Sequence, residues 1–315
     1  NIPSGVTETT PGKVELFWED EDGSIFQQTG LIEEAAIADG DFIPFFDITA
    51  SQNRKVKVSD LLPDTGIRGS IDGLILSNNV ADAAKDLDIA VGAAQDDGNA
   101  VNIVLAAALT KQLDAAWAVG TNAGALDGTE SVGGTPDAST WYHIWLNRRS
   151  DTGVVDVLAS ESATAPTMPT NYDQKRLIGA VLFDATPDII AFTQYVDGRV
   201  EWVIRALDYS DLTPGTSAVL VTVSTPLGIK TQALLTAGVR NSAEVYVVYT
   251  SPDSTDIVPG ATNFDIYVSA AFGMLNLERM TNTSSQIRLR SSDDIISTNF
   301  QLACLGFIHP RGRDA

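Results

Sequence analysis

The sequence has very few of the residues that catalyse reactions or bind metals. Among 315 residues there are two histidines, His143 and His309, and one cysteine, Cys304. A zinc site uses about three or four clustered ligands, and no stretch of this sequence supplies them. Cys304 cannot form a disulfide within the chain, and its apolar neighbours predict a small buried thiol. We therefore expect no metal, no cofactor and no cysteine nucleophile.

Long apolar runs and phosphate-binding loops are also missing. The longest apolar candidate, residues 101–109, is far shorter than the roughly 18 residues that cross a bilayer. The glycine-containing stretches at 120–125 and 133–134 lack the lysine of a phosphate-binding loop. We expect no membrane insertion and interpret both stretches as turns.

Positive charge is scarce. Lysine and arginine total 20 against 41 aspartates and glutamates, a formal net charge of -21. Residues 1–100 alone hold 19 acidic and 6 basic side chains. A surface this acidic repels phosphate backbones, so we expect no nucleic-acid partner and interpret the acidic excess as a solvated surface.

The acidic residues do not point to one particular chemistry. The clusters at 20–23 and 96–99 lack the alternating aspartates and the distal glutamate of a calcium loop, and we interpret both as β-turns. Paired carboxylates for glycoside hydrolysis depend on the fold, and among 41 acidic residues no pair stands out. An enzyme such as a polysaccharide depolymerase is therefore the weakest hypothesis for this chain, and we expect no enzyme.

Turn residues recur at short intervals between apolar stretches of four to nine residues, which is typical of a mainly β chain. The clearest hairpin spans residues 192–203, where Asp197-Gly198 matches a two-residue type I′ turn. Residues 141–147 are apolar on both faces, so this strand is expected inside a sandwich or at a subunit interface. The other expected strands are 14–18, 42–48, 71–76, 154–159, 177–183, 218–223, 231–237, 244–250, 264–269, 286–290 and 300–308.

Only a few short helices are expected, at residues 31–37 and 59–62, with Ser59 as an N-cap. Residues 101–117 fit two structures. Leu105, Leu109 and Leu113 recur every four residues as in a helix, yet residues 101–105 also fit a buried strand.

Two breaks containing proline and glycine, at residues 62–66 and 211–216, divide the sequence into three parts. We expect residues 1–64 to form a small N-terminal β segment for anchoring and assembly, and residues 65–212 to form a middle β-rich domain. Residues 213–315, with about six strands, suit a β-sandwich of jelly-roll type.

The aromatic strand supplies the candidate ligand or interface residues Trp141, His143 and Trp145. If exposed, these tryptophans would stack on sugar rings, but their place in an apolar strand favours core packing. His143 is expected to pack in a core or an interface, and His309 to be exposed or at an interface.

Several stretches resemble proteins of tailed-bacteriophage particles. Residues 39–62 resemble a segment near the start of tail-fibre and appendage proteins, with an apolar strand ending in Asp47, a basic pair at Arg54-Lys55 and a closing Asp60-Leu61-Leu62. In this segment we expect two strands, a turn at residues 51–53 and a final helical turn. Residues 140–158, 165–172, 176–179, 281–290 and 306–314 are similar to modules of phage virion proteins.

This resemblance implies a structural protein on the exterior of the virion, assembled in the host cytoplasm. The expected role is a tail-fibre or appendage subunit that attaches to other virion proteins through its N-terminal part. The resemblance also implies a homo-oligomer, a trimer in particular. The strand that is apolar on both faces and the N-terminal segment, which is too small for its own core, favour association with partners as well. The alternatives are a module that recognises host surface glycans and a head-decoration or collar protein.

Overall fold

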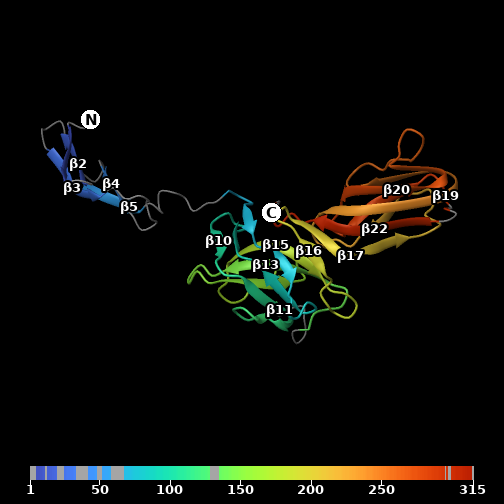
Figure 1. The fold of residues 1–315 in the computed structure, drawn as a ribbon, viewed down its shortest axis with the longest axis horizontal. Coiled ribbons are helices and arrows are strands. Elements are labelled where there is room, and N and C mark those ends of the chain that lie inside the picture. The colour runs from blue at the N-terminus through green and yellow to red at the C-terminus, as the bar shows by residue number, and fades with distance from the viewer. Residues whose placement is uncertain are drawn as a thin grey trace. The chain divides into compact units, whose positions relative to one another are not determined.

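The computed structural model describes residues 67–127, 135–294, 296 and 299–313 with their side chains, and the backbone of five strands before them. The chain divides into two compact units, residues 1–64 and residues 65–315, here called the N-terminal unit and the main unit. Every element in the described residues is a strand, which confirms the mainly β fold class (Figure 1). No helix with the length and hydrophobicity of a membrane span occurs in these residues.

The N-terminal unit holds two small antiparallel sheets. One contains β1 (Gly5–Thr10), β2 (Lys13–Glu19) and β3 (Ile25–Ile32), and the other contains β4 (Phe42–Asp47) and β5 (Gln52–Lys57). The strands expected at 14–18 and 42–48 are confirmed. Of the helix expected at 31–37, the first two residues end β3 and the rest lies outside the described residues. The expected helix at 59–62 and the acidic cluster at 20–23 also lie outside them.

The first half of the main unit is built around a seven-stranded sheet in the order β15-β13-β14-β12-β11-β8-β7. Its strands are β7 (Leu76–Asn78), β8 (Asp86–Ile89), β11 (Leu109–Ala116), β12 (Ala123–Leu126), β13 (Trp141–Arg148), β14 (Val155–Ser160) and β15 (Gln174–Leu182). A smaller sheet contains β6 (Ile71–Gly73), β9 (Gly92–Gln95) and β10 (Asn102–Leu105). Strand β13 pairs with β14 on one side and β15 on the other, and seven of its eight residues are buried.

Two expectations for this half are corrected. The strand expected at 71–76 is broken by positive φ angles at Gly73 and Leu74, so β6 and β7 belong to different sheets. Residues 101–117 form β10 and β11, which decides against a helix. The acidic turn at 96–99 is confirmed, because the Asp96 carboxylate accepts hydrogen bonds from the backbone of Gly98, Ala100 and Val101.

The second half of the main unit is another seven-stranded sheet, in the order β16-β17-β22-β19-β21-β18, with β20 paired to β19. Its strands are β16 (Phe192–Gln194), β17 (Arg199–Ser210), β18 (Val219–Thr222), β19 (Gln232–Thr250), β20 (Ile266–Met280), β21 (Gln286–Ser291) and β22 (Asn299–Ile308). The two strands expected at 231–237 and 244–250 are one continuous β19.

The predicted hairpin at 192–203 is confirmed as β16–β17, but its turn is not of type I′. Gly198 N–H donates to the Tyr195 carbonyl, and Tyr195 N–H donates to the Arg199 carbonyl. Of the two central residues in the predicted turn only Gly198 has a positive φ, of 91°. This pattern is a three-residue loop that closes with a glycine bulge.

The β19–β20 ribbon bends back on itself. Ala270 has a φ of 52°, and a Cβ atom on Gly273 would lie 2.6 Å from Val268 Cγ1. Asp265, directly before β20, pairs with Arg279, near the end of β20, at 2.8 Å. The bend therefore places residues 266–268 near Gly273, which lies later in the same strand.

One continuous hydrophobic core joins the two halves of the main unit. Trp141 of the first sheet packs against Trp202 and Phe307 of the second, with ring centroids 5.9 and 5.7 Å apart. Near the C-terminus, the buried Arg311 donates hydrogen bonds to the carbonyls of Gly73, Leu74 and Ile178. The halves are thus fixed to each other by core packing and by this arginine.

Candidate assembly surface

The aromatic residues predicted from sequence are not on the surface. Trp141, His143 and Trp145 are only 6%, 1% and 2% exposed, and they lie in the interior of the main unit. Trp145 packs in a small cluster with Leu158 and Leu177. Stacking on a sugar requires an accessible ring face, so burial removes the basis for glycan recognition at these three positions.

The two histidines and the cysteine are equally inaccessible. Burial lowers the pKa of His143 to about 4, and burial raises the pKa of the Cys304 thiol to about 12. His309 is fully buried, which corrects the expectation that it is exposed or at an interface, and its Nδ1 accepts a hydrogen bond from Arg311 N–H. Among the described residues no three His, Cys, Asp or Glu side chains are grouped to hold a metal ion.

A long unpaired strand edge is the most unusual surface feature of the main unit. Within the described residues β20 pairs only with β19, which leaves its other edge without a partner over 15 residues. Soluble proteins usually protect such edges with charges, prolines or short strands, because free backbone groups pair with other chains. Residues 267–277 contain neither a charged residue nor a proline.

The face of the ribbon that points to solvent also exposes large apolar side chains. Phe272, Met274 and Met280 alternate along β20 and are 55%, 65% and 45% exposed. The side chains of directly paired residues lie on the same face of a sheet. Paired residues therefore form rows of side chains that cross the sheet from β17 or β22, through β19, to β20. One such row contains Leu207 of β17, Ala303 of β22, Thr236 of β19 and Asn276 of β20. We call this surface the outer β20 face, and it includes Leu207, Leu234, Phe272, Met274 and Met280.

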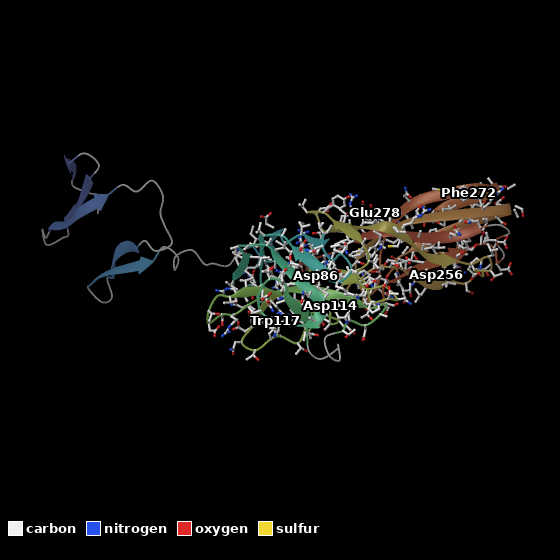
Figure 2. All side chains as sticks on the ribbon, turned by 60° about the horizontal axis from the view of Figure 1, so that its bottom comes forward. Asp86, Asp114, Trp117, Asp256, Phe272 and Glu278 are labelled. Atoms are coloured by element: carbon white, nitrogen blue, oxygen red, sulfur yellow. The ribbon has the colours of Figure 1, made fainter. Side chains whose placement is uncertain are left out.

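This face is close to neutral in a chain of net charge -21. The rows bring the acidic Glu201 and Glu278 onto the same surface as the basic Arg199 and Arg240. Phe272 and Glu278 lie along one side of the second sheet (Figure 2). Two copies of an acidic protein repel each other over most of their surfaces, and a nearly neutral face with exposed apolar side chains is where that repulsion is weakest.

The sequence only partly predicted this surface. It predicted a strand at 264–269 but not its continuation to Met280. The alternation of exposed Phe272, Met274 and Asn276 with the more buried Leu275 and Leu277 was the available signal. No protein-family model matches the chain, and no curated protein matches it.

Proposed function

We propose that this chain is a non-enzymatic structural subunit on the exterior of a tailed-bacteriophage particle, a tail fibre or a similar appendage. In this proposal the N-terminal unit attaches to other virion proteins, and the main unit projects outward. Copies of the chain associate through the outer β20 face, as a trimer. The resemblance of residues 39–62 to fibre and appendage proteins supports the place on the particle.

The single observation that supports assembly best is the unpaired edge of β20, uncharged over residues 267–277, beside a face that exposes Phe272, Met274 and Met280. Three copies that direct this face toward a common axis would remove it from water. Burial of Phe272, Met274 and Met280 would supply the hydrophobic contribution, roughly 25 cal/mol for each Å² of apolar area. Subunits without internal disulfides depend on such contacts for stability outside a cell.

Immunogold electron microscopy of intact phage particles tests the place on the virion. Antibodies raised against the purified chain are expected to label the tail or its appendages. A matched control uses antibodies preabsorbed with the same purified chain. If the antibodies detect the chain in the lysate but never label intact particles, the proposal is wrong.

A further inference from the structure

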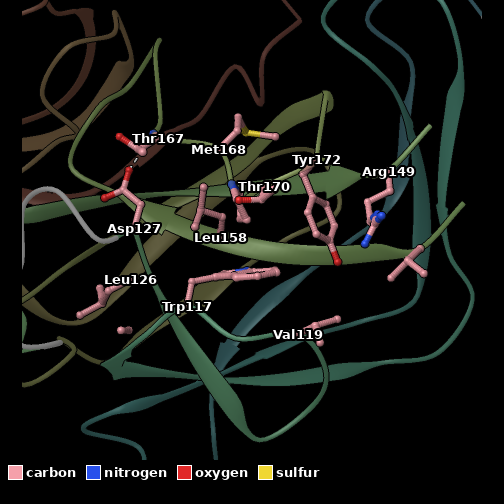
Figure 3. Close-up of a pocket in the computed structure, with 13 residues that line it drawn as sticks. Trp117, Val119, Leu126, Asp127, Arg149, Leu158, Thr167, Met168, Thr170 and Tyr172 are labelled. Atoms are coloured by element: carbon pink, nitrogen blue, oxygen red, sulfur yellow. Dashed lines mark hydrogen bonds between the residues drawn. The ribbon is translucent and has the colours of Figure 1, made fainter. Parts of the chain in front are cut away.

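An open cavity of about 660 Å³ lies in the first half of the main unit (Figure 3). Its walls come from the ends of β11 and β12, from strand β14 and from the loops on either side of β14. Volumes of roughly 300–1,000 Å³ are typical of sites that hold small molecules. The outer β20 face contributes no residue to this cavity.

Two aromatic rings form one wall of the cavity. Trp117 and Tyr172 meet edge to face, with centroids 5.1 Å apart and an interplanar angle of 75°. The indole N–H of Trp117 donates to the Val157 carbonyl at 3.0 Å, which fixes the ring. The Tyr172 hydroxyl makes no hydrogen bond to any described residue, and its oxygen points along the cavity toward Arg149 (Figure 3).

A buried ion pair holds the loop after Trp117 in place. Lys111 Nζ lies 3.1 Å from Asp156 Oδ1, and both side chains are at most 1% exposed. The same ammonium donates to the Ala118 and Gly120 carbonyls, while the Gly120 N–H donates to Asp156. The aromatic wall is therefore preformed rather than assembled on binding.

Among the described residues that line this cavity, Asp127 is the charged group with no counterion. Its side chain lines the cavity although the residue is only 3% exposed, and one of its oxygens accepts a hydrogen bond from Thr167 N–H at 2.9 Å. No described cationic side chain pairs with it. Arg149, the other charged residue of the wall, already makes a bidentate pair with Asp151 at 2.9 and 2.7 Å. A buried carboxylate without a cation is costly unless a ligand supplies one.

We propose that this cavity binds an organic cation, the guanidinium or ammonium end of an extended apolar chain. Asp127 would accept hydrogen bonds from the cation. The Trp117 and Tyr172 rings would contact the apolar chain, because the Lys111 ammonium already lies 5.7 Å from the centroid of the Trp117 ring. Leu158, Met168 and Val154 would contact the apolar chain. The net charge of -21 raises the local concentration of cations around the protein.

Isothermal titration calorimetry with butylguanidinium tests this proposal on the full chain. Butylurea is the matched neutral probe, since it keeps the shape and removes the charge. We expect saturable binding of one butylguanidinium and no binding of butylurea. Asp127→Asn keeps the acceptor for Thr167 N–H and should weaken binding about tenfold or more. Trp117→Leu removes aromatic contact surface and should weaken binding about tenfold or less.

Asp72→Asn is the matched control, because it removes the same charge from an exposed residue outside the cavity. This variant should bind butylguanidinium like the unmodified chain. Unfolding curves of all variants establish that each is folded before titration. Equal binding of butylurea, unchanged binding by Asp127→Asn, or no binding of butylguanidinium to the folded wild-type chain would each overturn the proposal.

Discussion

Strands β13 and β20 are similar in composition but very different in environment. Both are rich in apolar residues, and each belongs to a seven-stranded sheet of the main unit. Strand β13 has a partner on each side and is buried on both faces, whereas β20 has one partner and exposes Phe272 and Met274. An apolar strand thus contributes to the core in one place and leaves large apolar side chains exposed to water in the other.

The largest expected effect concerns the buried Lys111–Asp156 ion pair, which links β11 and β14 in the sheet that contains β13. Asp156→Ala leaves the buried Lys111 without its carboxylate, so we expect a loss of about 3–5 kcal/mol in the free energy of unfolding. Urea denaturation measures this loss. The control is Asp253→Ala, which breaks the exposed pair with Lys230 and should cost at most about 1 kcal/mol. Similar losses in the two variants would contradict the account.

Truncation of an apolar side chain compares the two strands directly. Ile144→Ala on β13 removes a fully buried side chain and should cost about 2–5 kcal/mol, through lost burial and the cavity that remains. Met274→Ala on β20 removes a side chain that is 65% exposed, and should change the free energy of unfolding by about 0.5 kcal/mol or less. These values apply to the monomer, so they are measured at the lowest workable concentration. If Met274→Ala destabilises the monomer as much as Ile144→Ala, Met274 packs within the monomer and the contrast between the two strands is wrong.

Acid should lower the free energy of unfolding through His143, which lies on β13. Burial lowers its folded-state pKa to about 4, while the unfolded chain titrates near 6.5, so protons favour the unfolded chain between these values. The contribution of the neutral imidazole is complete above pH 6.5 and falls by about 3 kcal/mol as the pH decreases to 4. His143→Leu should show a correspondingly shallower decline in stability from pH 7 to pH 4. Parallel declines in the two proteins would argue against a role for His143.

The smallest effect on stability is expected from a charge placed on the outer β20 face. Met274→Lys keeps the aliphatic stem and directs the ammonium to water, so the free energy of unfolding of the monomer should change by about 0.5 kcal/mol or less. Thermal unfolding of dilute samples checks this expectation. A large loss would mean that Met274 packs within the monomer, contrary to its exposure.

The sequence predicted β13 and the place of the hairpin at 192–203, although not its turn type, because their signals are local. An apolar run bounded by polar residues and an Asp-Gly pair depend on neighbouring residues alone. Residues 101–117 remained ambiguous for a geometric reason. A spacing of four residues returns to the same face in a helix and in a strand, so Leu105, Leu109 and Leu113 fit both.

Other features depend on contacts that are distant in the sequence. His309 is buried because Arg311 reaches carbonyls more than 130 positions earlier in the chain. The cavity near Trp117 unites residues from five segments, and the free edge of β20 follows from the order of strands in the sheet. Local patterns do not contain this information.

The molar mass of the full chain in solution, measured by light scattering after size exclusion, tests the central claim most directly. If copies associate through the outer β20 face as a trimer, the unmodified chain should have a mass of three times 33.5 kDa. The account also predicts 33.5 kDa for the double variant Phe272→Lys, Met274→Lys, with the unfolding of the monomer unchanged. A wild-type mass of 33.5 kDa, or a double variant that keeps the mass of the oligomer, would contradict the claim that the outer β20 face joins copies of this protein.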